Sequence, residues 1–105
     1  MTEIKITTLS SAPRVPFKFD GRILHTSDRY ELVHLTLHPG EAMDMHAQPF
    51  DVVFYVDGGT GTLQAGEERF QIEAGTAVHV AKGVMRAWSN PGAEPLRVLV
   101  NKILE

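Results

Sequence analysis

Turn-forming residues recur every few positions along the chain, and this spacing limits the fold more than any other feature of the sequence. Each signal contains glycine, in four cases together with aspartate, asparagine or proline. The signals are Asp20-Gly21, Pro39-Gly40, Asp57-Gly58-Gly59, Ala65-Gly66, Ala74-Gly75, Lys82-Gly83 and Asn90-Pro91-Gly92. No segment of ten or more residues between them shows a helical period, whereas strands fit the intervals.

Alternation of apolar and polar residues supports the same interpretation. Residues 69–73 read Arg, Phe, Gln, Ile, Glu, and residues 96–100 read Leu, Arg, Val, Leu, Val. This period of two is typical of half-buried strands. The predicted strands are 15–19, 22–26, 31–38, 43–48, 51–57, 60–65, 68–72, 76–80, 85–89 and 96–103. So many short strands predict an all-β sandwich or barrel.

The chain has the length and composition of one folded domain. It has 105 residues, of which 43% are hydrophobic and 22% charged, as in ordinary globular proteins. Residues 1–14 are expected to form an N-terminal arm, which can lie across a neighbouring subunit, and residues 15–105 the domain. Ser10-Ser11-Ala12-Pro13 is the one segment with the composition of a flexible connection.

Charge and cysteine content exclude several classes of function. The chain has no cysteine, so a disulfide framework, a thiolate nucleophile and a zinc finger are excluded. The formal net charge of -3 comes from interspersed charges without a basic run, which argues against nucleic acid and anionic membranes as partners. No stretch approaches the ~20 apolar residues of a membrane span. We therefore expect a cytoplasmic protein.

Two blocks of sequence hold the most specific pattern. The first, GEAMDMHAQPFDVVFYVDG, begins at Gly40 and ends at Gly58, with His46 between them. Its spacing resembles the first motif of the cupin superfamily, in which glycine, a pair of histidines, a glutamate and a second glycine follow one another. Gln48 stands where the motif has its second histidine, and Asp51 where it has its glutamate.

The second block, GTAVHVAKGVMRAWSN, resembles the second cupin motif. Gly75, Gly83 and Asn90 match that motif, whereas Ala81 replaces its proline and Arg86 replaces its histidine. The resemblance covers about residues 30 to 103. It implies a small single-domain jelly-roll β-barrel, and by analogy with other single-domain cupins a homodimer.

In the cupin family, three histidines and one glutamate converge on a metal in the barrel lumen. Here His46 is the one ligand type that is unchanged, and its imidazole suits several transition metals. The amide of Gln48 is a weak ligand and equally a group that lines a pocket. Asp51 is a third candidate ligand, although an aspartate beside Pro49-Phe50 also caps a turn. Together they are weak candidates for a divalent metal.

Arg86 departs most from the family pattern. A guanidinium keeps its proton and repels a cation, but its planar fork binds carboxylate or phosphate. The alternatives are an arginine on the outside or a salt bridge to Asp51. Tyr55 and Trp88, at period two from Asp51 and Arg86, are candidate ligand-binding aromatics in the lumen, although core packing explains them as well. We expect His34, His38 and His79 at the surface or at an interface.

Three functions remain open from the sequence. The preferred hypothesis is a protein that binds a small anionic or aromatic molecule in the lumen through His46, Gln48 and Arg86, without a strongly bound metal. The alternative is a metal-dependent enzyme of the dioxygenase, isomerase or decarboxylase type, which uses His46, Gln48 and Asp51. The third is a dimeric scaffold without ligand. Catalysis, and with it any catalytic residue, stays undecided because fold-level analogy does not fix function.

Overall fold

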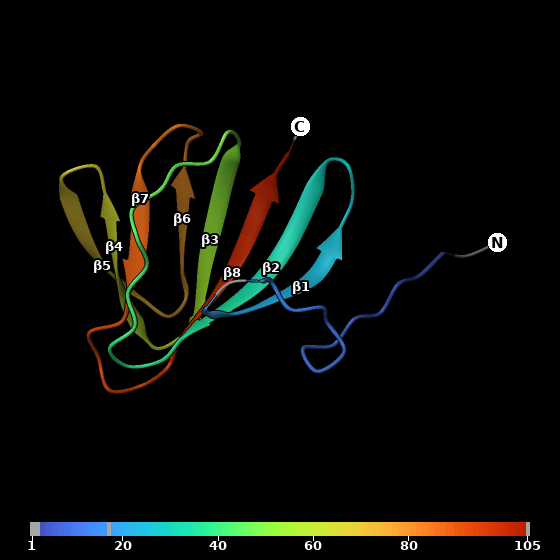
Figure 1. The fold of residues 1–105 in the computed structure, drawn as a ribbon, viewed down its shortest axis with the longest axis horizontal. Coiled ribbons are helices and arrows are strands. Elements are labelled where there is room, and N and C mark those ends of the chain that lie inside the picture. Colours follow the sequence, from blue (N-terminus) through green and yellow to red (C-terminus); the bar gives the residue numbers. More distant parts are fainter. Residues whose placement is uncertain (1–2, 17, 105) are drawn as a thin grey trace.

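The computed structural model describes residues 3–16 and 18–104, and these contain strands but no helix. The strands are β1 (Asp20–Thr26), β2 (Tyr30–Leu37), β3 (Asp51–Gly58), β4 (Thr60–Ala65), β5 (Glu68–Glu73), β6 (Thr76–Val80), β7 (Arg86–Ser89) and β8 (Leu96–Ile103). Figure 1 shows them as two layers with the N-terminal segment extending away from both. The predicted all-β class is confirmed.

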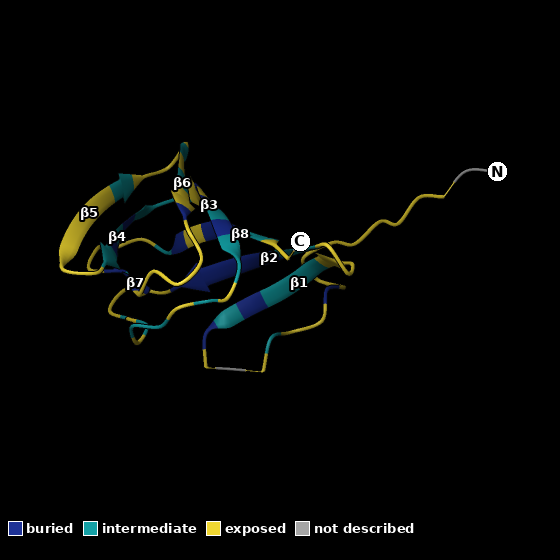
Figure 2. Cartoon of the chain, turned by 90° about the horizontal axis from the view of Figure 1, so that it is seen from above, coloured by how far each residue is buried: buried dark blue, intermediate teal, exposed yellow. Residues whose placement is uncertain are grey.

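The strands pair in two antiparallel sheets. The larger sheet has the order β1-β2-β8-β3-β6, and the smaller has the order β5-β4-β7. In the view of Figure 2 the sheets face each other across an interior, with β5, β4 and β7 on one side and β3, β8 and β2 on the other. Strand pairing among the described residues does not join the sheets into a closed barrel, so closure stays a prediction.

The core lies between the sheets and is made by alternate residues of the central strands. On β2, Val33, Leu35 and Leu37 are buried, and β3 and β8 bury their own alternate apolar residues in the same way. Figure 2 shows this burial concentrated on β2 and β8, whereas β5 is largely exposed. Burial of apolar area at roughly 25 cal/mol per Å² makes this layer the main source of stability.

Two predicted strands are not strands in the structure. The described residues of the range 15–19 form no strand, although the Val15 amide donates to the Gly21 carbonyl of β1 and Phe19 is buried in the core. Residues 43–48 run beside β7 through isolated bridges, one of which joins His46 to Arg86. Proline at position 16 and at position 49 lacks the amide hydrogen that continued ladder pairing needs.

The close approach of two connecting segments requires glycine at position 59. Gly59, between β3 and β4, has a φ of 75°, and a Cβ atom at this position would lie 2.4 Å from the Pro95 carbonyl oxygen. Any side chain there would therefore clash with the backbone of the β7–β8 connection. This contact fixes the end of β3 against the start of β8.

The three histidines expected at the surface or an interface differ in exposure. His34 lies on the face of β2 opposite the core and is only 5% exposed, so a place at the free surface is wrong for this residue. Its Nε2 lies 3.4 Å from an Asp57 carboxylate oxygen on β3. His38 and His79 are exposed.

Among the described residues, no helix is long and apolar enough to span a membrane.

Candidate functional site

The two sequence blocks lie side by side in the structure. The segment that joins β2 to β3 follows β7 in Figure 1, and backbone hydrogen bonds connect the two. The Met43 amide donates to the Trp88 carbonyl at 2.9 Å. His46 and Arg86 exchange both backbone bonds, at 3.1 and 2.9 Å. The motif residues are therefore direct cross-strand neighbours, and His46 and Arg86 form a hydrogen-bonded pair.

Asn90 of the second block has a structural role. It is 1% exposed, and its amide nitrogen donates to the carbonyls of Leu37 at 2.9 Å and Glu94 at 2.8 Å. Its side-chain oxygen accepts from the Gly92 amide. Asn90 thus joins the end of β2 to the turn after β7, and it holds the loops at one end of the interior in place.

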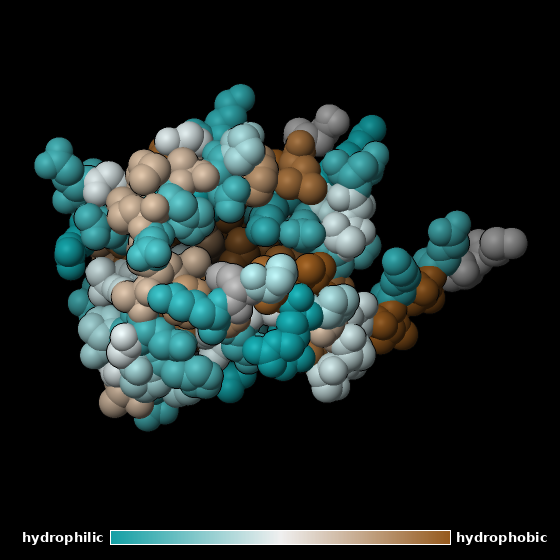
Figure 3. All heavy atoms as spheres, in the orientation of Figure 1, coloured by the Kyte–Doolittle hydropathy of each residue, from teal (hydrophilic) through white to brown (hydrophobic). Residues whose placement is uncertain are grey.

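A cavity of about 510 Å³ opens between the sheets. Figure 3 shows a hollow with apolar residues at its centre and polar residues around it. Its apolar lining includes Val33, Leu35, Met43, Phe54, Trp88 and Val100. Its polar lining consists of Lys18, Asp44, His46, Gln48, Arg86 and Lys102. A mostly apolar pocket with a few polar groups has the size and lining of a small-molecule site.

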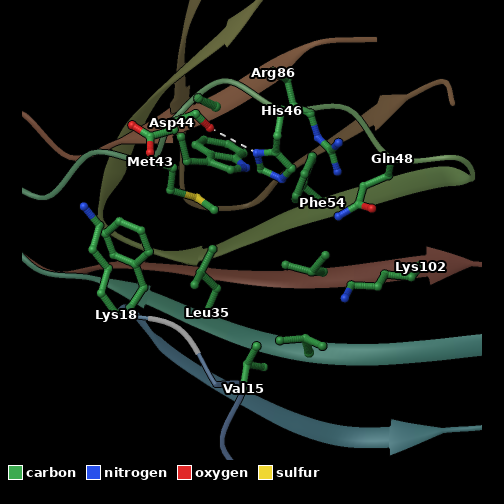
Figure 4. A pocket seen from close by; sticks show the side chains of 15 residues that line it. Val15, Lys18, Leu35, Met43, Asp44, His46, Gln48, Phe54, Arg86 and Lys102 are labelled. Carbon is green, nitrogen blue, oxygen red and sulfur yellow. Dashed lines mark hydrogen bonds between the residues drawn. The ribbon is translucent and has the colours of Figure 1, made fainter. Parts of the chain in front are cut away.

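Arg86 projects from β7 into this cavity, as Figure 4 shows. It is only 4% exposed, and its guanidinium carbon lies 5.7 Å from the centre of the Phe54 ring. Within the described parts of the chain its Nε has no hydrogen-bond partner, and no carboxylate forms an ion pair with it. Burial lowers the pKa of the guanidinium, which stays charged at neutral pH. A buried cation is thus left without an anion.

His46 and Gln48 face the same cavity from the segment beside β7, as predicted (Figure 4). The ring of His46 is fixed by a contact of 3.1 Å between its Nδ1 and the Asp44 carbonyl oxygen. The amide of Gln48 lines the wall between His46 and the start of β3. The structure therefore brings His46, Gln48 and Arg86 together.

The two candidate aromatic residues are separated. Trp88 lines the cavity, is 2% exposed and packs edge-on against Phe54 with ring centres 5.4 Å apart. Its indole Nε1 is buried and has no partner among the described residues. Tyr55 is 40% exposed on the outer face of β3, because its neighbours Phe54 and Val56 point inward. The placement of Tyr55 in the cavity is therefore wrong.

Asp51 also lies outside the cavity, contrary to its place among the candidate metal ligands. Its carboxylate accepts from the Lys82 amide at 2.9 Å and contacts His79 Nε2 at 3.3 Å. These two contacts, the Lys82 amide first, lower the pKa of Asp51. The predicted salt bridge between Asp51 and Arg86 does not form in the described residues. Asp51 therefore binds the turn at Lys82-Gly83 and not the Pro49-Phe50 turn that the sequence suggested it would cap.

The cavity also contains charged residues that the sequence did not single out. Lys102 follows Val98 and Val100 at period two on β8, so the alternation of this strand could have identified it. Lys18 and Asp44 come from connecting segments, where no period predicts which way a side chain points. Lys102 is paired with Glu31 at 3.1 Å. Of the basic residues in the cavity, Arg86 is the most deeply buried.

The residues present do not fit the metal that the cupin pattern implies. That pattern needs three histidines and one carboxylate, whereas His46 is the only histidine among the described residues that line the cavity, and Asp51 faces outward. In the described residues, no three His, Cys, Asp or Glu side chains are grouped to hold a metal ion. A buried guanidinium beside His46 would repel a cation at this position.

Comparison with solved structures supports the assignment of the fold. The protein TT1209 from Thermus thermophilus superposes with a TM-score of 0.80 at 26% identity, over 95% of this chain and 97% of that one. An RmlC-like cupin with a double-stranded β-helix fold from Methanocaldococcus jannaschii gives 0.80 at 22% identity, over 98% of this chain and 92% of that one. The polyketide cyclase RemF from Streptomyces resistomycificus gives 0.86 at 16%, over 98% and 81%.

No curated protein sequence matches the chain. The family model described as the cupin domain matches residues 33–101. This range includes both motif blocks, which the structure pairs side by side. The resemblance deduced from the glycine spacing is therefore confirmed, and this chain belongs to the cupin family.

Proposed function

We propose that the protein binds a small organic anion with an apolar or aromatic body in the cavity between its sheets, without a strongly bound metal. The observation that carries this proposal is Arg86, a buried guanidinium that faces the cavity without an acidic partner in the described residues. Leaving such a group unpaired is costly, and a ligand carboxylate would offset that cost. In this proposal the two sheets form a jelly roll and the cavity is its lumen.

The rest of the cavity fits the same ligand. Phe54, Trp88 and Val100 offer an apolar wall next to Arg86, which suits the body of an aromatic or branched acid. The amide of Gln48 can donate to a ligand oxygen or accept from a ligand donor. Among the described residues of the lining, Lys102 is paired with Glu31, and Lys18 and Asp44 carry opposite charges. The uncompensated charge of Arg86 therefore favours an anion over a cation.

The proposal is tested by titration of phenylacetate, which combines a carboxylate with an aromatic ring. Charge-assisted hydrogen bonds contribute about 1.5–3 kcal/mol, so Arg86→Met should weaken binding roughly 10- to 100-fold by calorimetry. Arg97→Met removes a positive charge on an exposed residue of β8 and should leave the affinity unchanged. Absence of phenylacetate binding, or equal binding by wild type and Arg86→Met, would contradict the proposal.

An enzyme remains the second candidate, because the polyketide cyclase RemF has a similar fold, and the metal-dependent type is the one that the cupin motifs imply. We expect protein purified without added metal to hold far less than one equivalent of any transition ion. The double variant Gln48→His/Arg86→His should raise this occupancy, since it supplies two further imidazoles beside His46 and removes the charge. Elemental analysis measures both. A stoichiometric ion in the wild-type protein that is lost in His46→Ala would favour the enzyme.

We further propose a homodimer that is located in the cytoplasm. The N-terminal arm supports the dimer, because Ile4 is 73% exposed, Ile6 is 85% exposed and Leu9 is 42% exposed. Figure 3 shows apolar residues on the part of this arm that extends away from the rest of the molecule. Contact with a second copy would remove them from water. Sedimentation at micromolar concentration should give twice the 11.6 kDa of the chain, and a monomer alone would contradict the dimer.

A further inference from the structure

The ring of His46 has a defined orientation of its nitrogen atoms. Nδ1 lies 3.1 Å from the carbonyl oxygen of Asp44, and a carbonyl can only accept. In the neutral imidazole Nδ1 therefore carries the hydrogen, and Nε2 carries a free lone pair. Figure 4 shows the ring among the side chains that line the cavity, with the Asp44 contact on one side. His46 thus offers the cavity a hydrogen-bond acceptor.

Arg86, the cross-strand neighbour of His46, offers the cavity hydrogen-bond donors instead of an acceptor. Because His46 and Arg86 exchange both backbone hydrogen bonds, their Cα atoms are expected about 5.5 Å apart, and their side chains leave the backbone on the same side. Both side chains line the same cavity. A guanidinium has donors only. With the imidazole of His46 in its neutral form, the site presents a cationic donor and an acceptor side by side.

A simple carboxylate cannot satisfy both Arg86 and the neutral form of His46. Its oxygens accept from Arg86, but it has no hydrogen to donate to Nε2 of His46. Gln48 can turn its amide either way, so it does not discriminate between ligands. Nε1 of Trp88 is a further buried donor without a partner among the described residues. The group that distinguishes one acid from another is therefore His46.

We infer that the ligand carries a hydroxyl group next to its carboxylate, so that the cavity is a site for a 2-hydroxy acid with an apolar body. This inference rests on the proposed function. The carboxylate binds Arg86, the hydroxyl donates to Nε2 of His46, and the body packs on Phe54 and Val100. A site built to hydrogen-bond a hydroxyl group discriminates strongly against the analogue without it, because the protein group is then left unpaired.

Three matched probes test the inference: phenylacetate, mandelate and 2-methoxy-2-phenylacetate. They share the ring and the carboxylate, and differ in having no hydroxyl, a free hydroxyl and a methylated one. We expect one enantiomer of mandelate to bind about tenfold more tightly than phenylacetate, the gain of one good hydrogen bond. The methoxy compound should lose that gain because it cannot donate. Calorimetric titration of the intact protein measures all three affinities.

Two variants at position 46 distinguish hydrogen bonding from general effects on the cavity. The side-chain amide of His46→Asn can still donate to the Asp44 carbonyl, but no atom replaces Nε2. We expect this variant to bind mandelate and phenylacetate equally. The amide oxygen of His46→Gln can reach the Nε2 position, so the preference for mandelate should partly return. The quantity compared is the ratio of mandelate affinity to phenylacetate affinity within each variant, which a general change in the cavity would leave unaltered.

The outcomes separate the two proposals. If phenylacetate binds in a manner that depends on Arg86 and the hydroxyl adds nothing, the inference is wrong and the proposed function stands. The same holds if the methoxy compound matches mandelate, or if His46→Asn keeps the preference. If none of the three acids binds, both proposals are wrong. A thermal unfolding curve for each variant confirms that it is folded before its affinity is compared.

Discussion

Two polar pairs, one inside the protein and one outside, come from the same two blocks of sequence but have different surroundings in the structure. Inside, His46 and Arg86 face the cavity, and the guanidinium has no acidic partner in the described residues. Outside, Asp51 accepts from the Lys82 amide and contacts His79. The chain thus satisfies its outer charge with its own groups. It leaves the inner charge for a partner that the described residues do not supply, which is why we assign binding to the inner pair.

The largest difference in the free energy of unfolding is expected between variants of the two aromatic residues Trp88 and Tyr55. Trp88→Ala removes a buried side chain that packs on Phe54, and it should lower the free energy of unfolding by about 3–5 kcal/mol. Tyr55→Ala, on the outer face, should cost about 1 kcal/mol or less. Urea unfolding monitored by circular dichroism compares the two variants. Similar losses would mean that Tyr55 is buried, for example by a second copy of the chain.

Removal of the inner cation should stabilise the protein in the absence of ligand. Arg86→Met replaces an unpaired buried charge by an apolar chain of similar length, and we expect the free energy of unfolding to rise by about 1–3 kcal/mol. Arg97→Met should change it by less than about 0.5 kcal/mol. Denaturant unfolding without added anion is the measurement. A loss of stability in Arg86→Met would show that the guanidinium has a structural partner. The proposed difference between an unpaired charge inside the protein and a paired charge outside it would then be wrong.

A smaller difference in ligand affinity is expected between variants of Gln48, inside the cavity, and Asp51, outside it. Gln48→Leu removes an amide from the cavity and should weaken binding of phenylacetate about 2- to 10-fold, the effect of one neutral hydrogen bond. Asp51→Asn changes a residue outside the cavity and should have no effect. The two variants are titrated in parallel. Equal weakening would place Asp51 within reach of the ligand.

The smallest effect concerns the pH dependence of stability. The pKa of Asp51 is lowered below the usual 3.8, first by the Lys82 amide and then by His79. A carboxyl group with a lowered pKa stabilises the fold above its unfolded value, and this contribution is lost as the pH falls through the folded value. Asp51→Asn should therefore be less stable than wild type at pH 6, with a difference that shrinks below pH 3.8. A difference independent of pH would contradict this role.

Much of the fold could be predicted from local pattern. Glycine turns and period-two alternation predict strands, because both depend on residues close together in the sequence. The spacing of Gly40, Gly58, Gly75 and Gly83 led to the cupin family, which the family model confirms. His46, Gln48, Arg86 and Trp88 were predicted to line the cavity, and they do. His46 and Gln48 are two residues apart, and so are Arg86 and Trp88, so the two members of each pair point to the same side of an extended chain.

The direction of Asp51 and Tyr55 was decided by the tertiary structure alone. Two residues separate Gln48 from Asp51, where the cupin motif has three or four, and Pro49 interrupts the pairing between them. A change of one residue in register turns every later side chain of a strand to the opposite face. Val52, Phe54 and Val56 therefore point inward on β3, and Asp51 and Tyr55 point outward. The sequence determined the strands and the family, but packing of β3 against the core decided which polar residues share the cavity with Arg86.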